Sequence, residues 1–155
     1  MSHRITGLSP DLFKHLWPLD DAALARQSIR RVVADSDRGF PCRISLDNAR
    51  AGETLLLLPF PHHDVAGPYR ASGPIFVREQ ATRAAVYEDG VPDTFLPRLL
   101  SVRAYDASGW MQACEVVEGT QLALAIDGFF QRADVAYLHL HNARPGCFAA
   151  RVDRH

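Results

Sequence analysis

"YLHLHNARPGCFAARVDR", residues 137–154, is the stretch that decides the fold. Alternating apolar and polar residues on both sides of "NARPG", at 142–146, are typical of a β-hairpin. With this loop, His141 pairs with Cys147, and one face of the hairpin carries Tyr137, His139, His141, Cys147, Ala149 and Arg151. The other face carries Ala136, Leu138, Leu140, Phe148, Ala150 and Val152. The second set predicts a core face, so the two histidines and the thiol are expected to share a polar surface.

The residues before this hairpin predict more antiparallel strands and a few short helices. Strands are expected at 28–35, 40–46, 54–60, 75–79, 99–106 and 110–117, with a hairpin turn at 107–109. Helices are expected at 9–17, capped by Ser9, from 20 or 21 to 27, and at 119–130, capped by Thr120. The fold class is therefore α+β: a single domain over residues 1–155, with a mainly antiparallel, curled sheet.

The composition is that of a protein with a hydrophobic core. The chain has 47% hydrophobic and 23% charged residues, and its net charge of -1 gives no general attraction to nucleic acid or an anionic membrane. The most apolar run, 54–60, is too short to span a bilayer, and the charged N-terminus does not resemble a signal peptide. Three widely spaced cysteines indicate no disulfide framework. A cytoplasmic protein with free thiols is expected.

The polar face of the terminal hairpin is the candidate site. His139 and His141 are candidate zinc ligands that would leave a position open for water. Alternatively, Cys147 is a nucleophile with a histidine as its base and Asn142 as an orienting group. A third alternative is that Tyr137, the histidines and Arg151 bind an anion. The face also fits a solvated or neighbour-packed surface without chemistry.

Other candidates lie earlier in the chain. His62 and His63 belong to a proline-rich loop at 59–74, from which either could complete a metal site. Ser72 precedes a Gly-Pro turn that can present backbone N–H groups to an anion, and Arg78 follows on the next strand. Cys42 is a further candidate ligand-binding residue, although a small core residue is the favoured interpretation.

Three stretches together, at 39–53, 68–79 and 139–154, resemble the bacterial proteins grouped as domain of unknown function 1203. Their order and spacing cover most of the chain. The resemblance implies a single-domain, cytoplasmic bacterial protein. It supplies no reaction, cofactor or catalytic residue.

The sequence thus predicts a small-molecule site, which could be enzymatic, centred on His139, His141 and Cys147. Arg78 and Arg151 are its candidate anion-binding groups, and zinc or another divalent metal is its candidate cofactor. The expected partner is a small or anionic ligand rather than nucleic acid or a membrane, and a homo-oligomer is left open. The competing interpretation is a non-enzymatic ligand-binding or protein-interaction domain with structural histidines and cysteines.

Overall fold

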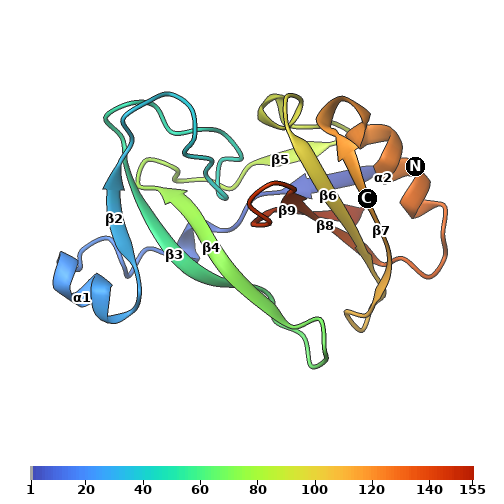
Figure 1. The fold of residues 1–155 in the computed structure, drawn as a ribbon, viewed down its shortest axis with the longest axis horizontal. Coiled ribbons are helices and arrows are strands. Elements are labelled where there is room, and N and C mark those ends of the chain that lie inside the picture. Colours follow the sequence, from blue (N-terminus) through green and yellow to red (C-terminus); the bar gives the residue numbers. More distant parts are fainter. Residues whose placement is uncertain (1) are drawn as a thin grey trace.

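The computed structural model describes residues 2–155, which form two antiparallel β-sheets lying side by side (Figure 1). The larger has the strand order β5-β1-β9-β8-β6-β7 and the smaller β2-β3-β4. The strands are β1 (His3–Thr6), β2 (Arg30–Val33), β3 (Thr54–His63), β4 (Ala71–Arg78), β5 (Val86–Glu88), β6 (Leu99–Tyr105), β7 (Met111–Glu118), β8 (Tyr137–Asn142) and β9 (Phe148–Arg154). The helices are α1 (Asp21–Arg26) and α2 (Leu122–Phe130). The predicted α+β class is confirmed.

The larger sheet has its hydrophobic core on the side covered by α2. Leu122, Ile126 and Phe130 recur every fourth residue along this helix and are buried. They join the core cluster that contains Leu138 and Leu140 of β8. This helix therefore covers the apolar face of the strand that also carries the two candidate histidines.

Replacing Gly128 with alanine is expected to stabilise the protein by about 0.5–1 kcal/mol. Gly128 is an exposed residue within α2, and a Cβ at this position would meet no atom within 4 Å. Alanine has fewer backbone conformations than glycine in the unfolded chain, so less conformational entropy is lost on folding. Urea unfolding would measure the change, and a loss of stability would contradict the expectation.

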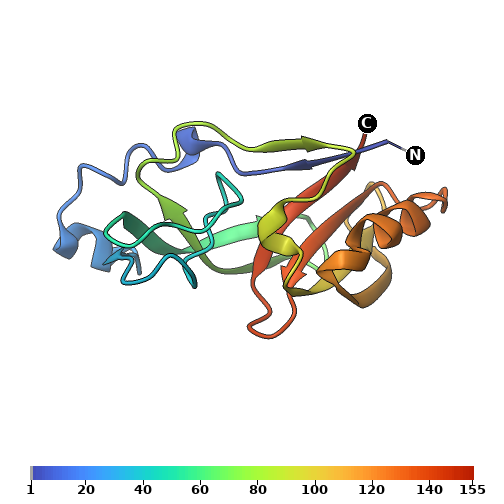
Figure 2. The ribbon, with the colours of Figure 1, turned by 90° about the horizontal axis from the view of Figure 1, so that it is seen from above.

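The smaller sheet has a core of its own. Phe13 and Leu24, from the N-terminal segment and α1, pack with Leu56 of β3 and Ile75 of β4. Figures 1 and 2 show α1 and α2 at opposite ends of the molecule, each beside its own sheet. The two sheets thus have separate apolar cores.

Two predicted elements are wrong. Residues 40–46 form turns and two isolated bridges rather than a strand, and Leu46 adopts a φ of 55° that no strand allows. Residues 9–17 form a short 3-10 turn at Pro10–Leu12 followed by further turns, although Ser9 does accept the N–H of Asp11 as a cap. The cap predicted at Thr120 is also wrong, because a 3-10 turn occupies 119–121 and α2 begins at Leu122.

Strand β3 ends at His63, three residues beyond the predicted strand end at residue 60 and within the predicted loop. It pairs with β2 only as far as Leu57, and beyond that residue β4 is its only partner. Pro59 and Pro61 lie in this outer part. Proline has no backbone N–H, and within residues 2–155 the edge of β3 that faces away from β4 has no neighbouring strand here that would require one. The extension matters because it carries His62 and His63 past the end of the β2 pairing and towards β8.

Candidate functional site

The register of the terminal hairpin differs from the predicted one. His139 pairs with Arg151 and His141 with Phe148, with a β-bulge between these pairs. The bulge places one extra residue, Ala149, in β9, where it is buried in the core. The predicted pairing of His141 with Cys147 is therefore wrong, and Phe148 lies on the histidine side rather than on the core side.

Strand β8 is buried on both faces. It lies between β6 and β9, and every one of its residues is buried. Leu138 and Leu140 face the core, while His139 and His141 face the outer part of β3. The histidines do share one face, as predicted, but that face is covered by the smaller sheet instead of solvent.

His62 and His63 of β3 and His139 and His141 of β8 form a histidine cluster between the two sheets. The ring centroids of His63 and His139 are 4.9 Å apart, and those of His62 and His141 are 5.1 Å apart. The Phe148 ring stacks on His62 at 5.4 Å. The structure therefore brings together the four histidines that the sequence analysis selected.

Hydrogen bonds fix only part of this cluster. His63 donates from Nδ1 to the carbonyl oxygen of Tyr69 at 2.7 Å, and its Nε2 accepts the hydroxyl of Tyr137 at 2.6 Å. His141 donates from Nδ1 to the carbonyl oxygen of Gly146 at 2.9 Å. In this cluster, the buried ring nitrogens that have no hydrogen-bond partner within residues 2–155 are His62 Nδ1, His139 Nδ1 and His141 Nε2.

The environment favours the neutral form of three of these imidazoles. Burial, together with the nearby imidazoles and Arg151, lowers the pKa of His139 to about 2. Burial also lowers the pKa of His141 to about 4, against the hydrogen bond to Gly146, which raises it. The pKa of His62 is lowered by burial and then by His63. At pH 7 these three rings therefore carry little charge.

Neutral imidazole is the form that binds a metal, so binding depends on whether several ligand side chains converge on one ion. Across residues 2–155, no three His, Cys, Asp or Glu side chains are placed to coordinate one ion. The rings of His62 and His141 meet edge to face instead, as do those of His63 and His139. In this arrangement the described histidines do not form the ligand set that the predicted zinc site requires.

Cys147 lies in a second group, the thiol–arginine cluster, formed with Arg43, Asn142 and Arg98. Its sulfur accepts a hydrogen bond from Nη2 of Arg43 at 3.1 Å and from Nδ2 of Asn142 at 3.4 Å. Arg98 donates to Oδ1 of the same Asn142 at 3.4 Å. No imidazole within residues 2–155 hydrogen-bonds this sulfur, so the structure does not bring the predicted histidine base to the thiol, whereas Asn142 is present.

Arg43 is the most unusual member of this cluster. Its side chain is 97% buried, since only 3% is exposed, and its other donors bind the carbonyl oxygens of Phe148 and Pro41. No carboxylate within residues 2–155 forms an ion pair with it. Burial lowers the pKa of Arg43, and attraction to negative charge on Cys147 and Cys42 opposes that effect. Hydrogen bonds to these two carbonyl oxygens and to the Cys147 sulfur satisfy the buried guanidinium, which lowers the cost of its burial.

The remaining predicted arginines already have ionic partners. Arg78 binds Glu53 at 2.7 Å in a largely buried pair. Arg151 pairs with Asp153 at 2.8 Å and lies over the ring of Tyr137. Neither guanidinium is presented to a ligand in this arrangement.

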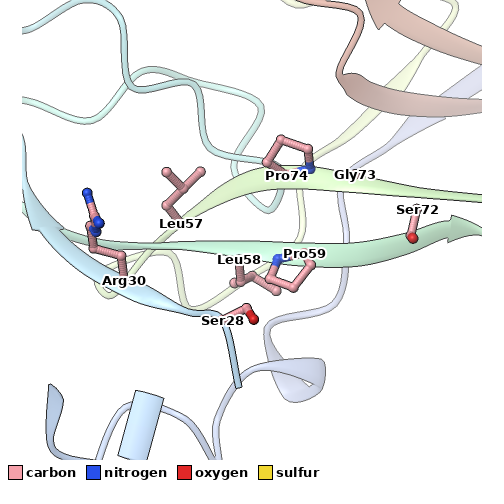
Figure 3. Close-up of a pocket in the computed structure, with 8 residues that line it drawn as sticks. All are labelled: Ser28, Arg30, Leu57, Leu58, Pro59, Ser72, Gly73 and Pro74. Carbon is pink, nitrogen blue, oxygen red and sulfur yellow. The ribbon is translucent and has the colours of Figure 1, made fainter. Parts of the chain in front are cut away.

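No side-chain hydrogen bond joins Cys42 or Ser72 to either cluster among residues 2–155. The sulfur of Cys42 is buried and accepts backbone N–H groups of Ile44 and Arg78, as expected of a structural residue. Ser72 lies in an open hollow of about 530 Å³ on the smaller sheet (Figure 3). The hollow is lined by Ser28, Arg30, Leu57, Leu58, Pro59, Ser72, Gly73 and Pro74. Apart from Arg30 it offers no charged group, so little in it would orient a small polar ligand.

Sequence reasoning missed the part that Arg43 and Arg98 play. Arg43 had a signal, because it directly follows Cys42 in the sequence and a cation beside a thiol favours the thiolate. The structure directs its side chain to Cys147 instead, 104 residues further along the chain. Arg98 had no distinguishing pattern among 16 arginines.

The fold and these clusters define an α+β protein in which a histidine cluster and a thiol–arginine cluster occupy the junction of two antiparallel sheets. The chain belongs to the family described as protein of unknown function (DUF1203), whose family model matches residues 39–154. This match confirms the resemblance and includes every member of both clusters. No curated protein and no solved structure gives a significant match. Within residues 2–155, no helix combines the length and the apolar character needed to cross a membrane.

Proposed function

We propose that the protein acts through the thiol of Cys147, which reduces small oxidants of the hydroperoxide class. The observation that carries the proposal is the buried guanidinium of Arg43, whose Nη2 lies 3.1 Å from the Cys147 sulfur and which has no carboxylate partner among the described residues. Cations and amide donors beside a cysteine favour the thiolate, which is the nucleophilic form. Cys147 is also partly exposed, so a small oxidant can reach it.

The neighbours of the thiol favour this reaction over acyl transfer. An amide leaving group needs a general acid, usually a histidine, and none contacts this sulfur among the described residues. Peroxide cleavage needs instead a positive environment for the oxygen that leaves, and Arg43 and Arg98 provide it. The leaving alkoxide or hydroxide then takes its proton from water.

The thiolate sulfur attacks one peroxide oxygen, so that an S–O bond forms, the O–O bond breaks, and Cys147 becomes a sulfenic acid. The sulfur loses two electrons and the peroxide gains them. A low-molecular-weight thiol then attacks the sulfenic sulfur to give water and a mixed disulfide, and a second such thiol releases Cys147.

Cys147 is expected to be alkylated by iodoacetamide at pH 7 about tenfold faster than Cys114. Cys114 is the matched control because it is the more exposed thiol and has no arginine hydrogen-bonded to it. Arg98→Gln should reduce the advantage of Cys147, since it removes one of the two cations. Peptide mass spectrometry would measure both rates, and dimedone would trap the sulfenic acid formed by hydrogen peroxide. Equal alkylation rates, or no dimedone adduct at Cys147, would reject the proposal.

A further inference from the structure

The contact between the two sheets beside β8 is polar, whereas each sheet has its own apolar core. Leu56 and Ile75 belong to the core of the smaller sheet, and Leu138 and Leu140 to that of the larger sheet. Between them lies the histidine cluster, whose members come from β3 and β8. Opening this contact would therefore leave both apolar cores intact.

The groups that face the cluster are cationic or uncharged. Its charged and titratable neighbours are Arg103 and Tyr105 of β6, Tyr137 of β8, Arg151 of β9 and Tyr69 of the β3–β4 connection. The carboxylates Asp106 and Asp153 act on Tyr137, and Asp153 is paired with Arg151. Asp64, which follows His63 in the chain, is paired with Arg70. A proton placed on one imidazole thus gains no anionic partner and meets repulsion from the other rings and from the two arginines.

We propose that the histidine cluster is an acid-sensitive latch that holds the outer part of β3 against β8 at neutral pH and releases it when the cluster is protonated. An imidazolium is strongly hydrated, so it favours the open arrangement in which water reaches the ring. His139 Nδ1 and His141 Nε2 have no hydrogen-bond partner among the described residues, so a proton added to either nitrogen would have no acceptor in the closed arrangement. The depressed pKa values of both residues agree with this direction.

The latch is connected to the thiol–arginine cluster through Phe148. The side chain of Phe148 stacks on His62, while its carbonyl oxygen accepts Nε of Arg43 at 2.7 Å. Arg43 in turn holds the Cys147 sulfur. Release of the latch therefore loosens the contact between Arg43 and Cys147, so acid lowers the reactivity of the thiol; this regulatory part rests on the proposed function.

Trp110 reports the state of the latch. Its ring lies 5.4 Å from that of Tyr69, whose carbonyl oxygen binds His63. In a Trp17→Phe protein, Trp110 is the remaining tryptophan. Its fluorescence is expected to change between pH 6 and pH 4 while the far-UV circular dichroism stays constant, because the cores and strands persist.

Two variants and one control test the role of the imidazoles. His139→Leu and His141→Leu each remove one titrating group, so each should move the fluorescence midpoint about one pH unit lower. His15→Gln removes an exposed histidine and should leave the midpoint unchanged. Using both leucine variants protects the test if one of them does not fold. An unchanged midpoint in a folded variant, or fluorescence that changes only together with the circular dichroism, would overturn the latch.

Labelling with 2,2′-dithiodipyridine, which reacts with thiols in acid, tests the coupling. The ratio of Cys147 to Cys114 labelling should fall at least threefold as the Trp110 signal changes. A constant ratio across a clear fluorescence change would overturn the coupling. Failure of the proposed function is distinguishable, because it shows already at pH 7, where the latch is closed, as equal labelling of the two thiols.

Discussion

Lowering the pH from 7 to 4.5 is expected to reduce the free energy of unfolding by up to about 5 kcal/mol. Burial holds the pKa of His139 at about 2 and that of His141 at about 4, against an ordinary value of 6.5. Below pH 6.5 the unfolded chain therefore takes up protons that the folded state refuses. Each of the two histidines removes about 1.4 kcal/mol per pH unit until the latch opens, because the released folded state takes up the same protons as the unfolded chain. The loss is a large part of the stability of a typical domain.

Urea unfolding at several pH values between 7 and 4.5 would measure this loss. His139→Leu should reduce the slope of stability against pH by about 1.4 kcal/mol per unit, since one histidine no longer titrates. His15→Gln, at an exposed position, should keep the slope of the unaltered protein. Most carboxylates titrate below this window and contribute little to the slope. Stability that is flat down to pH 4.5 would contradict the expectation.

Replacing Gly7 with alanine is expected to destabilise the protein by about 3 kcal/mol or more. A Cβ at this position would lie 2.0 Å from the carbonyl oxygen of Ile44 and 3.2 Å from the backbone nitrogen of Ala85. These two atoms are joined by a hydrogen bond of 2.9 Å, and Gly7 itself donates to the carbonyl oxygen of Ala85 at 2.8 Å. The methyl group therefore fits only if three backbone segments separate, because no side chain can move aside.

Gly67→Ala is the matched control for this substitution. A Cβ at Gly67 would meet nothing within 4 Å, so the change should alter stability by no more than about 0.5 kcal/mol. Thermal and urea unfolding of both variants would give the comparison. A Gly7→Ala protein within about 1 kcal/mol of the unaltered chain would show that these segments can separate at little cost.

The sequence was a good guide to the strands and a poor one to what covers them. Alternation predicted the β6–β7 hairpin and the two terminal strands, because side chains on one face of a strand recur every second residue. The same alternation made His139 and His141 look solvent-exposed. Their burial depends on β3 running across β8, and a pattern local to one strand carries no information about such a distant neighbour.

The hairpin register failed for a local reason. A bulge at Ala149 turns the Phe148 side chain from the core face of the hairpin to the histidine face. A small apolar residue at position 149 is compatible with a bulged and with a regular strand, so the sequence does not distinguish them. One displaced residue was enough to separate Cys147 from the imidazoles and to bring Phe148 among them. The partner of Cys147 could not be found from the sequence. Arg43 lies in a segment, 40–46, whose apolar and polar residues alternate as in a strand although the segment forms turns.

The position of β1 has a practical consequence for anyone who shortens the chain. This strand lies between β5 and β9 in the larger sheet, yet its residues 3–6 precede the segment 39–154 that the family model matches. A fragment restricted to that segment would leave the outer edge of β9 with open backbone donors and acceptors, and β5 without a neighbour. Unprotected edges of this kind recruit strands from other molecules, so such a fragment would tend to aggregate.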